Sequence, residues 1–215
     1  MSVTIPVSVG EALDKLTILD IKCDKIQDER RADCALERDT LLKNLQTYVD
    51  RFPWHYKILK EVNLTIWNLQ EGFHEKEVSE IKAGQICREI LKENDRRFRV
   101  KAKLNNLVSS RFREQKGYAK KKAFFYGHLG LGDMFWMCGA VRYLATFYDE
   151  VVVVCKEKYV SNVEKMYNDD PTIKIYSIVD DYVLQPFQAA VKPNILATTG
   201  KNIVINGNII KSKFI

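Results

Sequence analysis

The chain changes character at the stretch Phe124-Phe125-Tyr126-Gly127-His128-Leu129-Gly130-Leu131-Gly132-Asp133. A short apolar segment is followed by a glycine-rich turn and one carboxylate, and residues 133–147 then have the pattern of a helix. Glycine lets the backbone of such a turn approach a ligand closely, and the first N–H groups of the next helix are free to bind it. The stretch therefore predicts a strand, a ligand-binding turn and a helix, in that order.

The residues beyond this turn repeat the alternation of strand and helix. Strands are expected at 123–126, 150–155 and 173–178, and helices at 133–147 and 159–167. This alternation is typical of a doubly wound parallel sheet, whose ligands bind at the carboxyl ends of the strands. Further along, Pro186 and Pro193 mark a loop-like region, and 202–210 predicts a hairpin around Asn206-Gly207. We therefore expect a partial Rossmann-like α/β domain at 123–215.

Composition excludes several classes of protein. The 215 residues are 46% hydrophobic and 29% charged, which suits one or two soluble domains with a real core. An apolar run of about 18 residues, as a membrane span needs, is absent from the sequence, and the N-terminus does not resemble a secretory signal. The five cysteines have no Cys-x-x-Cys spacing and the three histidines are scattered. We therefore expect reduced thiols, no metal site and a cytoplasmic location.

The formal net charge of +6 is concentrated in one segment. Residues 109–122 hold six basic side chains and the single acid Glu114, so they carry +5. Because the rest of the chain is almost neutral, no specific nucleic-acid binding is expected. We interpret 109–122 as a solvated basic linker; contact with phosphate or with an anionic membrane surface is the alternative.

Residues 1–108 have helical periodicity almost throughout. Ser8 and Glu11 fit a capping box, in which each side chain satisfies a free N–H group at the start of a helix. The apolar stripe of that helix consists of Ala12, Leu16, Leu19, Cys23 and Ile26. Asp14 lies off this stripe, together with three lysines of the same helix.

Three more helices are expected before the linker. The first of them ends at Pro53 and the second near Gly72. The third covers 78–112. Narrow apolar stripes need partner helices, and the short breaks at 51–54 and 72–77 favour antiparallel neighbours. The sequence thus predicts an all-α bundle or hairpin at 1–108, followed by the linker and the α/β domain.

Two segments of the helical half resemble a known family. The opening Pro6-Val7-Ser8-Val9-Gly10-Glu11-Ala12-Leu13-Asp14-Lys15-Leu16, with Asn94-Asp95-Arg96-Arg97 and Lys101-Ala102-Lys103-Leu104-Asn105, is similar to the DUF6165 family, a bacterial family of unknown function. The segment 62–71 matches the family as well. The resemblance implies a helical fold and carries no established activity.

The α/β half resembles the N-terminal Rossmann half of GT-B glycosyltransferases, nearest the heptosyltransferase-like family. The resemblance rests on Gly130-Leu131-Gly132-Asp133 after a strand and on the helix containing Gly139-Ala140-Val141-Arg142. It implies that Asp133 is the base that activates an acceptor hydroxyl, and that a nucleotide sugar is the donor substrate, with no other cofactor. The donor-binding half of such enzymes is not seen in this chain.

The site expected from these residues is small. Asp133 is the candidate catalytic residue, and Gly127, His128, Gly130 and Gly132 are the candidate ligand-binding residues. For Asp133 the alternative is a plain helix N-cap, one of the commonest uses of aspartate. The tryptophans fall on helical stretches and are expected in the core rather than as platforms for sugar rings: Trp54, Trp67 and Trp136.

Two functions from different classes remain open on the sequence. The first is a glycosyltransferase-like protein of surface polysaccharide or glycan synthesis, which binds a nucleotide sugar or a glycan acceptor. The second is a non-catalytic scaffold, in which the helical domain forms a homo-oligomer or docks a catalytic partner chain. A GT-B enzyme holds its substrates between two Rossmann domains, so the source of the donor half discriminates between them.

Overall fold

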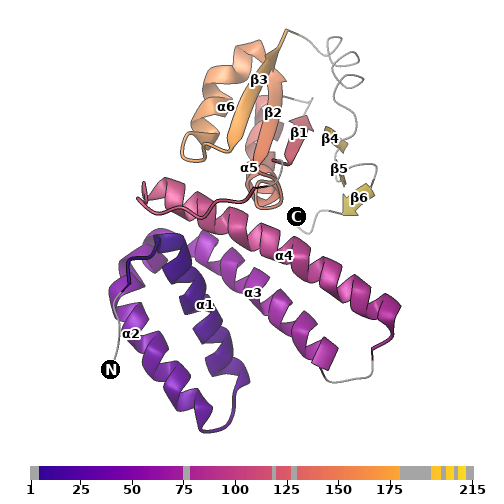
Figure 1. Ribbon diagram of the computed structural model, residues 1–215. Helices are drawn as coiled ribbons and strands as arrows, with labels where there is room; N and C mark the ends of the chain where they lie inside the picture. The colour runs from indigo at the N-terminus through magenta and orange to yellow at the C-terminus, as the bar shows by residue number, and fades with distance from the viewer. Residues whose placement is uncertain are drawn as a thin grey trace. The chain divides into compact units, whose positions relative to one another are not determined.

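The computed structural model describes residues 5–74, 78–117, 120–126 and 130–179, together with the backbone of 195–199, 202–205 and 208–211. The chain divides into two compact units, 1–116 and 117–215. The first is helical and the second is a partial α/β domain, as the sequence predicts (Figure 1). None of the helices in the described ranges combines the length and apolar character that crossing a membrane requires.

The helical unit consists of four helices, α1 Val9–Lys25, α2 Arg30–Arg51, α3 Pro53–His74 and α4 Glu80–Leu107. Helix α1 contacts each of the other three and is the centre of the bundle. Its buried apolar side chains are distributed around the helix rather than along one stripe, and include Leu13, Leu16, Leu19, Ile21 and Cys23. Asp14, which lies off the predicted apolar stripe, is nevertheless only 2% exposed, because α3 and α4 cover that side of α1.

The helix boundaries follow local sequence signals. Ser8 caps α1 by accepting a hydrogen bond from the Glu11 N–H at 3.2 Å. Pro53 opens α3, where its fixed φ suits a first helical residue and its missing N–H costs nothing. The break between α2 and α3 is therefore confined to Phe52, shorter than the expected 51–54.

The α/β unit begins with three parallel strands, β1 Lys122–Tyr126, β2 Glu150–Lys156 and β3 Ile173–Ile178. They are joined by α5 Leu131–Leu144 and, after a short 3-10 turn at Glu157–Tyr159, by α6 Val160–Tyr167. The register places Phe125 beside Val153, and Val153 beside Ile175. Helices α5 and α6 contact each other as well as the strands, so both cover the same face of the sheet.

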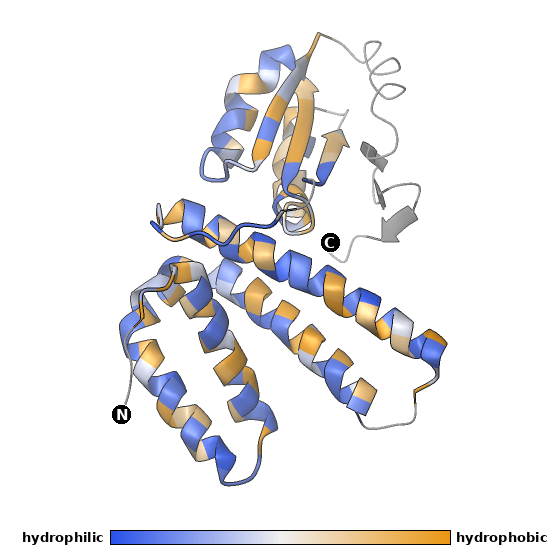
Figure 2. Cartoon of the chain, in the orientation of Figure 1, coloured by the Kyte–Doolittle hydropathy of each residue, from blue (hydrophilic) through white to orange (hydrophobic). Residues whose placement is uncertain are grey.

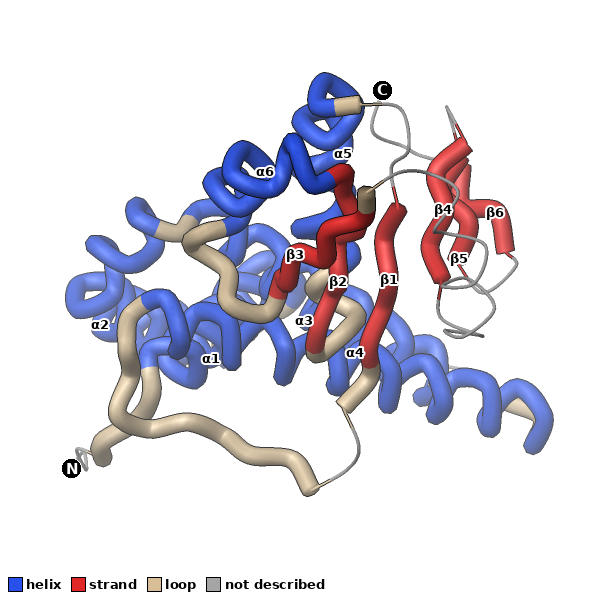
Figure 3. The backbone as a smooth tube through the Cα atoms, turned by 90° about the horizontal axis from the view of Figure 1, so that it is seen from above, coloured by secondary structure: helices blue, strands red, loops and turns tan. Residues whose placement is uncertain are grey.

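The sheet continues on the other side of β1. Strand β4, Ile195–Thr199, runs parallel to β1, and β5 Asn202–Ile205 and β6 Asn208–Lys211 follow as an antiparallel hairpin (Figure 3). The hairpin confirms the sequence prediction, whereas β4 was not expected. The strand order is β3-β2-β1-β4-β5-β6, so the order reverses at β1. In doubly wound sheets ligands bind beside such a reversal, at the carboxyl ends of the strands.

The core of the α/β unit lies between this sheet and its two helices. Val151 and Val153 from β2 pack with Phe125 from β1 and with Val141 and Leu144 from α5. Figure 2 shows β2 as hydrophobic along almost its whole length, as expected of a strand with neighbours on both edges and little access to solvent. The core thereby fixes α5 against β2 and determines where its first turn lies.

Candidate functional site

The turn between β1 and α5 contains all the site residues expected from the sequence. Gly127 and His128 lie outside the described residues. Gly130 is the N-cap of α5, with φ 159° and ψ −173°. That conformation is essentially confined to glycine, because a Cβ disfavours it. A glycine is therefore required at Gly130 by the backbone of the turn itself.

Asp133 is the third residue of α5 and is half-buried. The N-cap alternative is wrong, because Gly130 occupies the cap position and the helix begins at Leu131, two residues before the expected start. One carboxylate oxygen of Asp133, Oδ2, lies 3.9 Å from the point where a Cβ on Gly130 would stand. The carboxylate thus folds back over the turn. Within the described part of the chain Asp133 has no hydrogen-bond or ion-pair partner.

The position of this carboxylate in the sheet is that of a ligand site. The turn leaves the carboxyl end of β1, the strand with β2 on one side and β4 on the other. The backbone of Gly132 is open there, since no described atom lies within 4 Å of the point where a Gly132 Cβ would stand. Gly130, Gly132 and Asp133 are therefore brought together at one helix start.

Two large aromatic side chains stand on the same helix, one turn further on. Phe135 is 70% exposed and Trp136 is 85% exposed. The expectation that Trp136 belongs to the core is wrong: the buried side of α5 is formed by Met134, Ala140, Val141 and Leu144, and Trp136 lies on the opposite side. Trp54 is exposed as well, at the start of α3.

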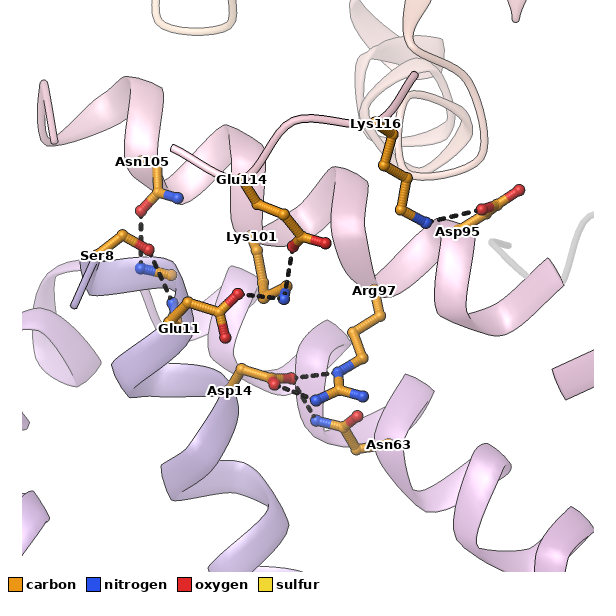
Figure 4. A network of polar contacts seen from close by, with 11 residues as sticks. Ser8, Glu11, Asp14, Asn63, Asp95, Arg97, Lys101, Asn105, Glu114 and Lys116 are labelled. Atoms are coloured by element: carbon orange, nitrogen blue, oxygen red, sulfur yellow. Dashed lines mark hydrogen bonds and ion pairs between the residues drawn. The ribbon is translucent and has the colours of Figure 1, made fainter. Parts of the chain in front are cut away.

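A second cluster of chemistry-bearing residues occurs in the helical unit, and the sequence analysis missed it. Asp14 accepts hydrogen bonds from the Arg97 Nε and the Asn63 Nδ2, each at 2.8 Å, and its other oxygen pairs with the Arg97 Nη2 (Figure 4). Asn63 also donates to Thr17 at 2.8 Å. The hydrogen bonds that Arg97 donates to Asp14 raise the pKa of Arg97 and outweigh the opposing effect of burial.

Lys101 forms the next part of this cluster. Its ammonium pairs with Glu11 and, at 2.8 Å, with Glu114, which lies in the predicted linker. Burial disfavours the charged lysine, but hydrogen bonds to the two carboxylates outweigh burial and raise the pKa of Lys101 above its usual value. Of the expected capping box, the Ser8 hydrogen bond is present. The Glu11 carboxylate instead binds Lys101, 90 residues away in the sequence.

The backbone of α1 also takes part. The Gly10 N–H donates to the Asn105 Oδ1 at 2.8 Å, and a Cβ on Gly10 would stand 2.7 Å from the Lys101 carbonyl oxygen. Helices α1 and α4 therefore approach each other at a distance that only glycine permits. The cluster is closed, since each of its charged groups named here has an opposite charge or a hydrogen-bond partner.

Part of the predicted linker belongs to this cluster. Glu114 binds Lys101, and the Lys116 ammonium lies 2.9 Å from the Asp95 carboxylate and 4.9 Å from the centre of the Phe98 ring. The expectation of a solvated linker is therefore wrong for these two residues, which are held on α4.

The chemistry of the two clusters differs. Asp14 is buried and both of its carboxylate oxygens are already bound by Arg97 or Asn63, so the Asp14 cluster fixes the packing of α1, α3 and α4. The sequence signal that pointed to it was the pair of segments at 6–22 and 94–105, whose residues meet here. Asp133, half-buried and open, is the better candidate for chemistry.

Comparisons with known proteins give no relative for this chain. No protein-family model, no curated protein and no solved structure matches it. The resemblances to the DUF6165 family and to GT-B glycosyltransferases therefore stay predictions, and the function has to be argued from the geometry of the site.

Proposed function

We propose that the α/β unit is the acceptor-binding half of a glycosyltransferase-like protein of surface polysaccharide or glycan synthesis, with Asp133 as its base. One observation carries the proposal: a half-buried carboxylate without a partner among the described residues stands at the carboxyl end of β1, where the strand order reverses. A carboxylate that only stabilised the fold would be expected to have a hydrogen-bond donor nearby.

The proposed reaction is transfer of a sugar from a nucleotide to an acceptor hydroxyl. The Asp133 carboxylate takes the hydroxyl proton as the oxygen attacks the anomeric carbon, and the bond to the nucleotide diphosphate breaks. For this the carboxylate must come within about 2.6–3.2 Å of the hydroxyl oxygen. The open backbone at Gly132 and the turn at Gly130 leave room for that approach. Gly127 and His128 are the remaining ligand-binding residues of the proposal.

The donor side of such an enzyme has to come from elsewhere. The described residues contain one sheet, and 117–215 forms one unit. A nucleotide sugar bound across two Rossmann domains therefore needs a second domain, which we place on a catalytic partner chain or on a segment outside these residues. The helical unit is the proposed point of attachment.

Calorimetric titration with a panel of nucleotide sugars, with and without candidate acceptor glycans, tests the proposal. The wild-type chain is compared with Asp133→Asn, which keeps the size of the side chain and removes its charge. We expect both proteins to bind an acceptor glycan saturably. When a donor-binding domain is supplied, we expect sugar transfer by the wild type alone. Equal transfer by the two proteins would remove Asp133 from the role of base. Glu164→Gln, a charge change on α6, is the matched control.

A non-catalytic scaffold is the second candidate, and a separate observation favours it. Large apolar side chains stand exposed on the helical unit: Leu36 on α2, and Ile81 and Leu91, at 79% and 67%, on α4. Large apolar side chains exposed on a helix are available for contacts with another protein. Sedimentation equilibrium of the double variant Ile81→Asp/Leu91→Asp tests this function. A wild-type oligomer that becomes monomeric supports it, and Ile5→Asp, an exposed apolar position outside the helices, is the control.

A further inference from the structure

The outward side of α5 has an unusual composition for a surface. At about 100° per residue, Gly132, Phe135, Trp136 and Gly139 lie on one side of the helix. Phe135 and Trp136 are among the most exposed large apolar side chains in the described part of the chain. At Gly132 and Gly139 no described atom lies within 4 Å of the point where a Cβ would stand. Two aromatic groups thus flank bare backbone.

The direction of helical side chains brings these rings toward the candidate site. Long side chains on a helix lean toward its N-terminus and cover the turn before their own Cα. Phe135 and Trp136, three and four residues after Gly132, therefore lean over the first turn of α5 on either side of that glycine. Asp133 is three residues before Trp136 and so is its neighbour on the helix surface. Bare backbone, two aromatic rings and one open carboxylate meet at a single turn.

The area of the patch formed by Phe135 and Trp136 limits the size of the partner that it can bind. Two aromatic side chains offer on the order of 400 Å² of surface at most. Each partner of a stable protein interface buries about 800 Å², so the patch is too small to hold a second copy of the chain by itself. The next turn adds little, because Arg142 there is paired with Asp169 and with the Met166 carbonyl oxygen. The patch fits a small ring with an apolar face and hydroxyl groups at its edge.

We infer that Phe135 and Trp136 form the platform for a pyranose ring of the acceptor, and that Trp136 is the positioning residue that presents a hydroxyl to Asp133. The inference rests on the proposed function and deepens it by naming the acceptor class and its subsite. The C–H groups of the ring lie on the indole, above the bare backbone of Gly132. One hydroxyl at the ring edge then points to the Asp133 carboxylate.

Fluorine NMR of the full chain labelled with 5-fluorotryptophan tests the platform without requiring catalysis. The three tryptophans Trp54, Trp67 and Trp136 give three signals, and Trp136→Phe assigns one of them. The probes are methyl α-D-glucopyranoside, methyl α-D-mannopyranoside and methyl β-D-galactopyranoside. We expect saturable movement of the Trp136 signal with at least one probe, and an affinity at least about tenfold weaker in Trp136→Ala, measured on the sugar signals.

Two further variants separate a binding role from a structural one. Gly132→Leu fills the space beneath the ring and should abolish sugar binding while the protein keeps its helical circular dichroism. Trp54→Phe, at an exposed tryptophan of the helical unit, should bind like the wild type. If transfer is detected, Trp136→Ala should raise the KM for the acceptor at least about tenfold and leave the nucleotide-sugar affinity unchanged.

The outcomes distinguish this inference from the proposed function. Sugar binding at Trp136 without any transfer would support the platform and contradict the proposed reaction. Transfer that depends on Asp133 but is unchanged in Trp136→Ala would overturn the platform alone. Movement of the Trp136 signal with protein concentration, in the absence of sugar, would also overturn it by showing a second copy on this surface. If none of the three sugars moves the Trp136 signal saturably, the platform is overturned as well.

Discussion

Two aspartates near the start of helices have opposite surroundings in this protein. Asp14, in the second turn of α1, is 2% exposed and is held by Arg97 and Asn63. Asp133, in the first turn of α5, is half-buried and has no partner in the described part of the chain. The residue type and the type of element are the same, and the difference comes from what covers each helix.

This contrast separates a carboxylate that builds the fold from one that is free to act. Removing a partner from a buried ion pair leaves a charge that neither water nor protein satisfies. Removing an open carboxylate leaves nothing unsatisfied. The two sites should therefore respond in opposite ways to the same substitutions, with stability affected at one and ligand chemistry at the other.

The largest expected effect is that of Asp14→Ala. The substitution leaves the Arg97 guanidinium and the Asn63 amide without their acceptor inside the bundle. We expect a loss of about 3–5 kcal/mol in the free energy of unfolding. Asp133→Ala should change it by less than ~0.5 kcal/mol. Urea denaturation followed by far-UV circular dichroism measures both, and equal losses would remove the contrast between the two aspartates.

Alanine substitutions at Gly10 and Gly132 should give the next largest difference in the free energy of unfolding. In Gly10→Ala the new methyl group meets the Lys101 carbonyl oxygen, a backbone atom that cannot move aside by a rotamer change. We expect a loss of about 1–3 kcal/mol. Gly132→Ala adds a methyl group in open space within a helix and should stabilise by ~0.5–1 kcal/mol. Thermal unfolding of the two variants should thus shift in opposite directions, and a shift in the same direction would contradict the packing described here.

The ion pair between Lys101 and Glu114 should make the stability of the buried cluster depend on pH. Two carboxylates raise the pKa of Lys101, so the stability that they contribute is present below the unfolded pKa of lysine and is lost as pH rises through the folded value. Glu114→Gln should cost about 0.5–1 kcal/mol at neutral pH. The variant then has less stability to lose in alkali. Its unfolding free energy, measured from neutral to strongly alkaline pH, should fall less than that of the wild type.

The smallest effect is expected from the ion pair of the α/β unit itself. Arg142 holds the pKa of Asp169 below its usual value. The stability from this pair is present above the unfolded pKa of the carboxyl group and is lost as pH falls through the lowered folded value. Because Asp169 is half-exposed, Asp169→Asn should cost at most ~0.5 kcal/mol and only above the acid range. A constant difference from the wild type at all pH values would contradict this assignment.

Local patterns predicted the elements of this fold well. The strand at 173–178 matches β3, and Ser8 marks the start of a helix as expected. Pro53 ends the second helix as expected, but it also opens α3 instead of lying in a longer break. Helix α5 begins two residues earlier than predicted, because Gly130 rather than Asp133 is the cap. Strand β4 was missed because its residues carry no clear alternation and its parallel partner, β1, is distant in the sequence.

Side chains whose environment depends on distant residues were harder to predict. Asp14 and Lys101 have the polar character of surface positions, and only the meeting of segments more than 80 residues apart buries them. For Trp136 the error was the opposite one. Its size and apolar character are typical of a core residue, but the side chain is exposed. At Asp133 the sequence located the helix start to within two residues, because glycine and a lone carboxylate at a strand end are a local pattern.

The closed cluster around α1 also has a consequence for how the chain is made. Asp14 and its partner Arg97 are separated by 83 residues, so Asp14 leaves the ribosome well before the guanidinium that neutralises it. At roughly 5–20 residues per second, the delay is on the order of 4–17 s. During this time the first helix, which becomes the centre of the bundle, has to wait without its charged partners. The helical unit can close only after nearly all of its own residues have been synthesised.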